Sequence, residues 1–356
     1  MNKSRQHGQV VLTSDGPRNT HIEDSDVSAA GCASSIPATV DQYIDGITIE
    51  RVHFTSDKQD MTFDMRNVDA PIANTLRRLL LAEVPSMAIE KVYLYQNTSL
   101  IPDETLCHRL GLIPIAVDAR KFNRKTPPTY KTPSDIDVEP TPDEKDALVF
   151  ALHIKCTANA QARKEASEPT ELYINSNVYS GDLKWVPIGS QAETFAAQPP
   201  APVHPDILIA KLRPGQEIEL RCHCYKGVGQ DHAKFSPVAT ASYRLLPRIR
   251  LLRRVVGEPA IRLKESFSEG VIGIAKSRED GQDEAVVLDA RRDLLSRNVF
   301  RHDDLADAVE ICRDKRHYMF SVEGTGTLPT ECLVEEACNV IEAKCSRLRS
   351  CINELC

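Results

Sequence analysis

The chain has 356 residues, enough for one to three domains with a sizeable core. Its 51 acidic side chains outnumber its 44 basic ones, whereas domains that hold nucleic acid by themselves are usually basic. No stretch is apolar over the length of a membrane span, and the N-terminus lacks the apolar core of a signal peptide, so we expect a soluble intracellular protein whose partners are proteins. Eleven scattered cysteines indicate reduced thiols rather than a disulfide framework.

Residues 1–39 are rich in Ser, Thr, Asp and Gly and predict a disordered tail. Apolar and polar residues then alternate from Ile47 to Phe54 and from Met61 to Met65, which predicts two strands around a polar turn. We expect these strands to flank the helix that follows them.

That helix has defined ends. Asp69 is a suitable N-cap, Pro71 is tolerated in the first turn, and Pro85 prevents continuation past about Val84. An apolar stripe on one side predicts contact with a core and consists of Ile72, Ala73, Leu76, Leu79 and Leu80.

The other side of this helix carries arginines beside an aliphatic residue, namely Asn74, Arg77, Arg78 and Leu81. Two interpretations remain open. A solvated surface with one exposed leucine is ordinary, because singly exposed apolar residues are common. A second, protein-facing surface is the alternative, since a guanidinium group binds carboxylates and carbonyls through paired hydrogen bonds at interfaces.

A strand and a short helix are predicted next. Alternation from Met87 to Gln96 is typical of a strand. Asp103 is expected to cap a helix that ends at Leu110, with Gly111 in the left-handed conformation. Two basic residues lie on this helix, His108 and Arg109.

The middle of the chain predicts an antiparallel β-rich region. The segment from Lys121 to Lys145 is crowded with proline and charge and is expected to form a surface loop. Strand patterns follow at Ala147–Ile154, around Tyr173 and Trp185, at Asp206–Leu212 and, after a Pro-Gly turn, at Ile218–Cys222.

Two later segments invite functional interpretations. The glycines at 227 and 229 do not form a nucleotide site, because the glycine spacing, the Lys-Ser/Thr pair and the following helix are missing. His232 and Lys234 nearby have no carboxylate or cysteine at catalytic spacing. The basic run from Arg248 to Arg254 is either a phosphate-binding patch or a strand with charged edges, and the acidic balance of the chain favours the strand.

The C-terminal third ends in a long helix. Gly270–Ile274 predicts a strand, Leu305–Ile311 a helix and Tyr318–Glu323 the last strand. Pro329 is expected to open a helix whose apolar stripe must be buried against this protein's own sheet or against a partner's helix. The stripe consists of Val334, Ala337, Ile341, Cys345, Leu348, Ile352 and Leu355.

Two blocks resemble the signature of the alpha-type subunits of RNA polymerase, the family of bacterial alpha and its archaeal D-like counterpart. They are ANTLRRLLLAEVP from Ala73 and HRLGLIP from His108. HAKFSPVATASYRLLP from His232 is similar to the point where the chain of this family returns to its dimerisation domain, and FSVEGTG from Phe320 is similar to the element that closes that domain.

The resemblance implies an α+β fold: a discontinuous dimerisation domain, made of a sheet plus two helices, interrupted by an inserted, mainly antiparallel β domain. Residues 40–85 and 237–356 are expected to form the dimerisation domain, the second part including the long C-terminal helix. Residues 86–236 are expected to form the inserted domain.

No metal site or cofactor is expected. Cys222 and Cys224 are a single close pair with no second pair nearby, which disfavours zinc. An iron–sulfur cluster needs four thiolates, and only Cys312 is available where some archaeal relatives carry such clusters. The RNA polymerase II counterpart carries a cysteine cluster in its inserted domain, so the sequence is more similar to the larger alpha-like subunits shared by RNA polymerases I and III.

The resemblance therefore implies a non-catalytic assembly subunit of RNA polymerases I and III, in the nucleus including the nucleolus, that serves synthesis of the ribosomal RNA precursor, 5S RNA and transfer RNA. The RNA polymerase II counterpart and a free-standing protein-binding scaffold are the alternatives. The implied partner is a smaller alpha-like subunit. On that heterodimer the second-largest and then the largest subunit assemble, with small assembly subunits, and nucleic acid is contacted only through the complex.

Two sets of residues are predicted for these surfaces, and no paired acid and base, activated nucleophile or metal site is found at catalytic spacing. The dimer interface is predicted at Ile72, Leu76, Leu79, Leu80, Val334, Ala337, Ile341 and Leu348. Docking of the large subunits is predicted at Arg77, Arg78, Leu81, His108, Arg109, His232 and Lys234.

Overall fold

The computed structural model describes residues 11–13, 16–18, 39–124, 142–161, 168–276 and 281–355, and divides into two units, Met1–Ile47 and Thr48–Cys356. In the first unit, strands β1 (Val11–Thr13) and β2 (Gly16–Arg18) pair antiparallel, and helix α2 (Val40–Asp45) follows its N-cap Thr39. The rest of the tail predicted over residues 1–39 lies outside the described residues, as does most of the loop predicted over residues 121–145.

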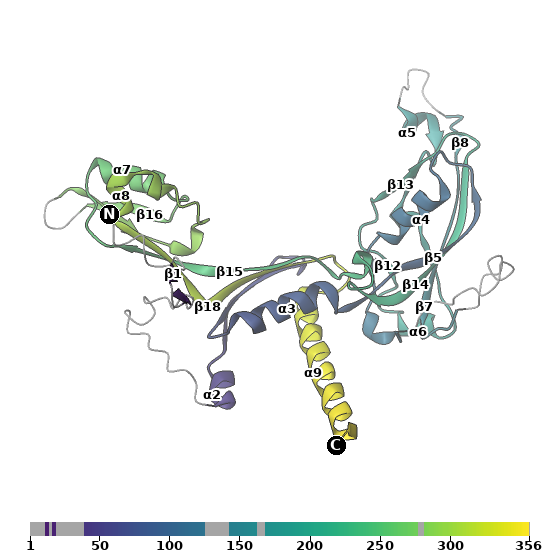
Figure 1. Cartoon of the computed structure of the whole chain (residues 1–356). Helices are drawn as coiled ribbons and strands as arrows, with labels where there is room; N and C mark the ends of the chain where they lie inside the picture. Colours follow the sequence, from purple (N-terminus) through teal and green to yellow (C-terminus); the bar gives the residue numbers. More distant parts are fainter. Residues whose placement is uncertain are drawn as a thin grey trace. The chain divides into compact units, whose positions relative to one another are not determined.

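The second unit contains two four-stranded antiparallel sheets (Figure 1). The split sheet, ordered β15-β18-β4-β3, consists of β3 (Thr48–Phe54), β4 (Asp60–Arg66), β15 (Val238–Leu251) and β18 (Val309–Gly324). The inserted sheet, ordered β11-β7-β14-β5, consists of β5 (Pro85–Asn97), β7 (Ala147–Lys155), β11 (Lys184–Val186) and β14 (Glu217–Val228).

Shorter elements complete this unit. Four strand pairs join β6 (Ile115–Ala116) to β12 (Ala201–Pro202), β8 (Thr157–Ala158) to β9 (Tyr173–Ile174), β10 (Asn177–Tyr179) to β13 (Leu208–Lys211), and β16 (Ile272–Lys276) to β17 (Asp283–Val287). The α-helices are α3 (Ala70–Ala82), α4 (Asp103–Gly111), α5 (Pro169–Leu172), α6 (Gln191–Thr194), α7 (Glu258–Glu265), α8 (Asp303–Ala306) and α9 (Thr330–Leu355). Within the described ranges, no helix combines the length and the apolar character that a membrane crossing requires.

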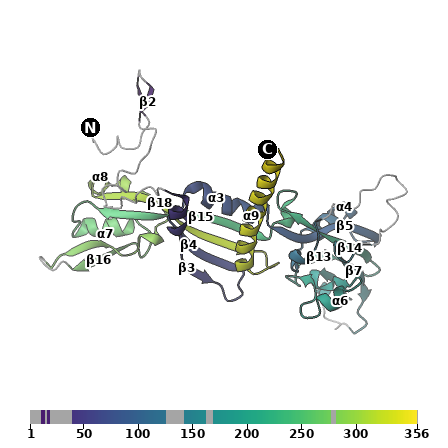
Figure 2. The same ribbon diagram turned by 90° about the horizontal axis from the view of Figure 1, so that it is seen from below.

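One face of the split sheet is apolar and carries two helices. Phe63, Phe320 and Tyr243 occupy paired positions on three neighbouring strands, and the rings of Phe63 and Phe320 stack with centroids 4.9 Å apart. Helices α3 and α9 contact strands of this sheet and each other, and both lie on the same face of it (Figure 2). The predicted arrangement of a sheet with two helices is confirmed.

Helix α3 follows the split sheet directly. Asn67 is left-handed, with φ of 60°, a conformation that asparagine tolerates, and Asp69 occupies the predicted N-cap position. The carboxylate of Asp69 makes no capping hydrogen bond and instead accepts one from Arg316 at 3.4 Å. The helix start is therefore fixed by backbone geometry and by β18 rather than by a side-chain cap.

The opposite face of the split sheet holds a buried ionic cluster. Asp64 is fully buried and receives two hydrogen bonds from the guanidinium group of Arg291, one of them at 2.6 Å, and His317 Nε2 lies 3.0 Å from the same carboxylate. Burial raises the pKa of Asp64, but the hydrogen bonds and charges of Arg291 and His317 outweigh it and hold this pKa below its ordinary value. The cluster thus ties the segment around Arg291 to β4 and β18.

The inserted sheet covers a second core, which includes Ile89 and Met87 of β5, Phe150 of β7 and Leu220 of β14. Strand β14 lies between β5 and β7 and pairs with both over most of its length. The predicted antiparallel, β-rich middle of the chain is confirmed.

A third core forms where β15 and β18 extend beyond the split sheet. Ile249 and Ile311 are paired across these strands and pack against α7, α8 and the β16–β17 hairpin. The helix predicted over Leu305–Ile311 is wrong, because α8 ends at Ala306 and Val309 already belongs to β18. Pairing with a long neighbouring strand overrides the local pattern there.

The run from Arg248 to Arg254 is a strand and its exit, and three of its arginines are paired with carboxylates of this chain. Arg248 contacts Asp314 at 3.0 Å, Arg250 contacts Glu310 at 3.9 Å, and Arg254 contacts Glu284 at 3.3 Å. The structure therefore supports the charged-edge strand over the phosphate-binding patch.

The predicted ends of α4 are wrong by one residue each. Pro102 is at the N-cap position, and the Asp103 carboxylate accepts a hydrogen bond from Asn97 Nδ2 at 2.7 Å instead of capping the helix. Gly111 is the last helical residue and is not left-handed, and Leu112 forms the C-cap in a right-handed conformation. The helix continues through Gly111 because it packs there against β5, where Ile89 O lies 3.4 Å from the position of a Cβ at residue 111.

The loop after β14 binds the C-terminal end of α3. Gln230 N donates a hydrogen bond to Ala82 O at 2.8 Å, and Gly229 lies so close that a Cβ there would overlap Leu81 O. The loop continues into the 3-10 helix η5 (Ala233–Phe235), where Phe235 O accepts a hydrogen bond from Ser86 Oγ at 2.7 Å. Glycine at 229 is therefore required by close backbone approach.

We predict that Asp64→Asn lowers the free energy of unfolding of the full chain by about 3 kcal/mol at pH 7, because it leaves Arg291 without its buried counter-ion. The folded-state pKa of Asp64 is lowered, so its contribution is present above the ordinary carboxyl pKa and is lost as pH falls through the folded-state pKa. Denaturant unfolding should show the difference from wild type shrinking below about pH 4.

The matched control is Glu50→Gln, which breaks the exposed Glu50–Arg66 pair on the same sheet. A loss below about 1 kcal/mol is expected for it. Equal losses for the two variants would contradict the role assigned to burial.

We also predict that Gly229→Ala lowers the free energy of unfolding by roughly 1–3 kcal/mol, because the new Cβ must displace the backbone of α3. Gly111→Ala is the control, since its Cβ would meet only ordinary contacts of 3.4 Å or more. Thermal and denaturant unfolding of both variants would test this, and a neutral Gly229→Ala would show that the loop and α3 are not in close contact.

Candidate functional site

The predicted interface residues of α3 divide into two groups. Leu79 and Leu80 are buried in the core of this chain, as is Ala73. Ile72 is 45% exposed and Leu76 is half-buried. The first group holds α3 on the split sheet, and the second leaves an apolar surface along the helix.

Helix α9 shows the same division along its length. Leu333 and Ala337 are fully buried, and Val334 is half-buried. Residues 341–354 are all exposed, including Ile341 and Leu348, the latter 64% exposed. The first turns of α9 therefore pack on this chain, and its second half extends away from the split sheet (Figure 1). The apolar stripe of that second half is exposed.

An ion pair between Lys344 and Glu83 joins α9 to the C-terminal end of α3. This pair was not identified from the sequence, because its partners are far apart in the chain. It links the start of the exposed half of α9 to the end of α3.

The arginine-bearing side of α3 lies apart from the buried stripe. Arg77 donates two hydrogen bonds to Asn74 Oδ1, at 3.0 and 2.8 Å. Arg78 is exposed and Leu81 is half-buried. Asn74 therefore positions one guanidinium group, and the mixed surface predicted from the sequence is present on the helix.

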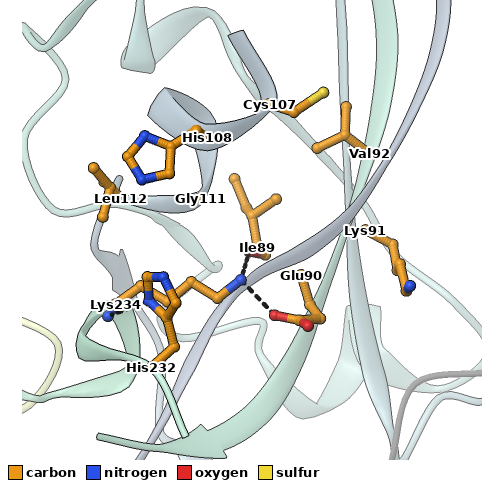
Figure 3. A pocket seen from close by; sticks show the side chains of 10 residues that line it. All are labelled: Ile89, Glu90, Lys91, Val92, Cys107, His108, Gly111, Leu112, His232 and Lys234. Atoms are coloured by element: carbon orange, nitrogen blue, oxygen red, sulfur yellow. Dashed lines mark hydrogen bonds and ion pairs between the residues drawn. The ribbon is translucent and has the colours of Figure 1, made fainter. Parts of the chain in front are cut away.

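Three of the predicted docking residues line one pocket. His108 from α4, and His232 and Lys234 from the loop that binds α3, surround a cavity of about 290 Å³ whose other wall is the segment Ile89–Val92 of β5. Figure 3 shows the rings of His108 and His232 on the same side of the pocket, with the Lys234 side chain reaching towards β5. Residues that are distant in sequence are thus brought into one site.

Lys234 is held firmly at the base of this pocket. Its ammonium group donates a hydrogen bond to Ile89 O at 2.9 Å, forms an ion pair with Glu90, and lies 5.2 Å from the centre of the Phe235 ring. Its backbone N–H donates to His232 Nδ1 at 3.1 Å. Only 14% of the Lys234 side chain is exposed, so these contacts within the chain fix its position.

Arg109 lies elsewhere. Its guanidinium group donates hydrogen bonds to the carbonyls of Leu208, at 2.6 Å, and Ile209, at 3.3 Å, which attaches α4 to β13. Sequence reasoning placed Arg109 with His108 on a docking surface, but the structure separates them and gives Arg109 a role inside this chain. Its part in docking remains a prediction.

Two thiols of the inserted sheet lie in its apolar core. Cys222 and Cys224 are buried in its core, and burial raises the pKa of both thiols well above the ordinary value. At the pocket, burial, followed by the charges of Asp103 and Glu104, raises the pKa of Cys107, so this thiol is not an activated nucleophile.

Among the described residues, one cluster has metal-ligand character, namely His153, Glu217 and Glu219 on the outer surface of the inserted sheet. Glu217 contacts His153 at 2.7 Å and Lys155 at 3.2 Å. The ammonium group of Lys155 occupies the position of a cation beside this carboxylate, so the arrangement is that of an exposed ion-pair network.

Sequence comparison agrees with this architecture. A model of the RNA polymerase Rpb3/Rpb11 dimerisation domain matches residues 62–345. The chain is 48% identical to DNA-directed RNA polymerases I and III subunit RPAC1 of Mus musculus, over 95% of this chain and 93% of that protein. It is 46% identical to the RPAC1 protein of Saccharomyces cerevisiae, over 83% of this chain and 85% of the relative.

More distant relatives follow the same pattern. The archaeal DNA-directed RNA polymerase subunit Rpo3 of Methanosphaera stadtmanae is 29% identical over 84% of this chain and 96% of its own length. The resemblance predicted from the two signature blocks is confirmed by these matches, including the preference for the subunits of RNA polymerases I and III. The chain belongs to the RNA polymerase Rpb3/Rpb11 dimerisation domain family.

Proposed function

We propose that this chain is the non-catalytic alpha-like subunit of DNA-directed RNA polymerases I and III. The similarity to RPAC1 proteins over nearly the full length of both chains carries this proposal. Nucleotidyl transfer then takes place on another chain, and the subunit serves synthesis of the ribosomal RNA precursor, 5S RNA and transfer RNA in the nucleus, including the nucleolus.

The first partner we propose is an Rpb11-like, smaller alpha-like subunit. The exposed residues Ile72, Ile341 and Leu348 support this assignment, because they continue the buried stripes of α3 and α9 beyond the part that this chain covers itself. A helix from the partner laid against α3 and α9 would bury them. The residues on those stripes that are already buried, Leu79, Leu80 and Ala337, would form the floor beneath that contact.

The second set of partners is proposed for the arginine-bearing side of α3 and for the pocket. The heterodimer would receive the second-largest subunit there and the largest subunit later, together with small assembly subunits. The proposal is supported by Arg78 and Leu81 on α3 and by His108, His232 and Lys234 at the pocket, because basic and aliphatic side chains occur together on surfaces outside the predicted dimer contact.

Affinity purification of the tagged full-length chain from its native cells tests the function as a whole. We expect the largest subunits of both RNA polymerase I and RNA polymerase III among the co-purifying proteins. Recovery of RNA polymerase II alone would show that the chain is the alpha-like subunit of that polymerase instead. Recovery of no polymerase would favour a free-standing protein-binding scaffold.

A charge introduced at Leu348 should prevent pairing with the smaller alpha-like subunit. Because Leu348 is exposed here, Leu348→Asp should leave the fold intact while weakening the heterodimer by about tenfold or more. Ser350→Asp places the same charge on the opposite side of α9 and should have little effect. Co-expression and pull-down of the two subunits would measure the effect of each variant on heterodimer recovery. Equal loss of the heterodimer with both variants would exclude an interface on one side of α9.

Charge reversal at Arg78 should act on a different partner. We expect Arg78→Glu to retain the smaller alpha-like subunit and to lose the second-largest one. Lys276→Glu, a reversal at an exposed position on β16, should retain both. A pull-down in which Arg78→Glu loses both partners would show that the change disrupts α3 itself.

A further inference from the structure

The pocket between β5, α4 and η5 has an excess of basic groups. Lys91, Lys234, His108 and His232 line it, and Glu90 is the one carboxylate among its lining residues. Glu90 is already paired with Lys234. A ligand that enters this pocket therefore meets a surface suited to negative charge.

Lys234 is prepared to bind a further acceptor. An ammonium group has three N–H donors, and in the described residues two of them are directed to Ile89 O and to Glu90. Because the side chain is largely buried and anchored at both contacts, little rotamer freedom remains to be lost on binding. The third donor, or exchange with Glu90, can bind an incoming carboxylate.

The two imidazoles stand at the entrance to the pocket. His108 and His232 are exposed and their rings lie on one side of the pocket, whereas the Lys234 ammonium group lies towards β5 (Figure 3). Leu112, 51% exposed, adds an apolar wall beside them. The site thus combines a fixed ammonium group, two exposed imidazoles and an apolar rim.

Gly111 leaves the room that such a group needs. A Cβ at residue 111 would lie 3.4 Å from Ile89 O and 3.8 Å from Lys234 Cδ. The same Cβ would lie 4.0 Å from Lys234 Nζ, so a longer side chain would compete for the space beside the ammonium group. The absence of a side chain at this position keeps Lys234 accessible from the pocket.

We propose that this pocket binds an aspartate or glutamate side chain of the second-largest subunit, with Lys234 as its main contact. The inference rests on the proposed function, because it names the chemistry of the partner segment at that docking surface.

The first experiment maps the segment that enters the pocket. A benzoyl-phenylalanine photo-crosslinker replaces Leu112 in the tagged full chain, the assembled polymerase is purified and irradiated, and the crosslinked peptide is identified by mass spectrometry. The control carries the crosslinker at Leu100, which is 90% exposed and outside the pocket.

We expect the Leu112 crosslink to fall on a peptide of the second-largest subunit within a few residues of an Asp or Glu. A crosslink to a segment without acidic residues, to another subunit, or at no higher yield than from Leu100 would overturn the proposal. Since the readout is taken on purified polymerase, such a result would refute the pocket assignment while the proposed function stands. Failure to recover any polymerase would refute the function itself.

The second experiment fills the pocket. Gly111→Leu should lower recovery of the second-largest subunit by about tenfold, and Gly111→Ala by less, while both retain the smaller alpha-like subunit. Undiminished recovery with Gly111→Leu would overturn the proposal. If the Gly111→Leu variant also loses the smaller subunit, the substitution has perturbed the fold. The peptide crosslinked from Leu112 then decides whether the pocket binds the second-largest subunit.

Discussion

The pairing of β15 with β18 is the interaction on which the rest of this structure depends. The two strands pair from Val238 opposite Gly324 to Leu251 opposite Val309. Because β18 also pairs with β4, strands from both ends of the chain form one sheet. This sheet brings α3, which follows β4, against α9, which follows β18. The surface proposed for dimerisation therefore exists only after contacts between segments far apart in the sequence have formed.

The two faces of that sheet have different physical roles. Stacked aromatic rings such as Phe63 and Phe320 make the helical face, where burial of apolar area stabilises the fold and tolerates small shifts. On the other face the fully buried Asp64 must meet both Arg291 and His317. A buried charge that loses its partners is costly, so a change in the register of β4 against β18 would be penalised. We regard this cluster as the element that fixes the register.

Much of the fold could be predicted from the sequence, since strand alternation and helix-end signals are local. The ends of α3 and the strands around Met61–Met65 follow from such patterns. Prediction was wrong where a distant segment decides the local conformation: residues 309–311 pair with β15, and Gly111 lies against β5. Contacts between distant segments also explain why the pocket could be predicted only in part. His108 and Lys234 could be found in signature blocks, but the contact of Lys234 with Ile89, 145 residues away, and its pairing with Glu90 leave no local signal.

The predicted dimer surface and the pocket are connected through one continuous path of contacts. The C-terminal end of α3 is bound by the loop at Gly229 and Gln230, and the same loop continues into η5, which places Lys234 against β5. The exposed half of α9 has little support from its own chain, and an isolated helix of a few turns is marginal in water. A partner that binds this half and the exposed stripe of α3 would therefore stabilise α3 as well. Because the pocket loop is attached to the end of α3, the helix that pairs with the first partner also supports the site proposed for the second.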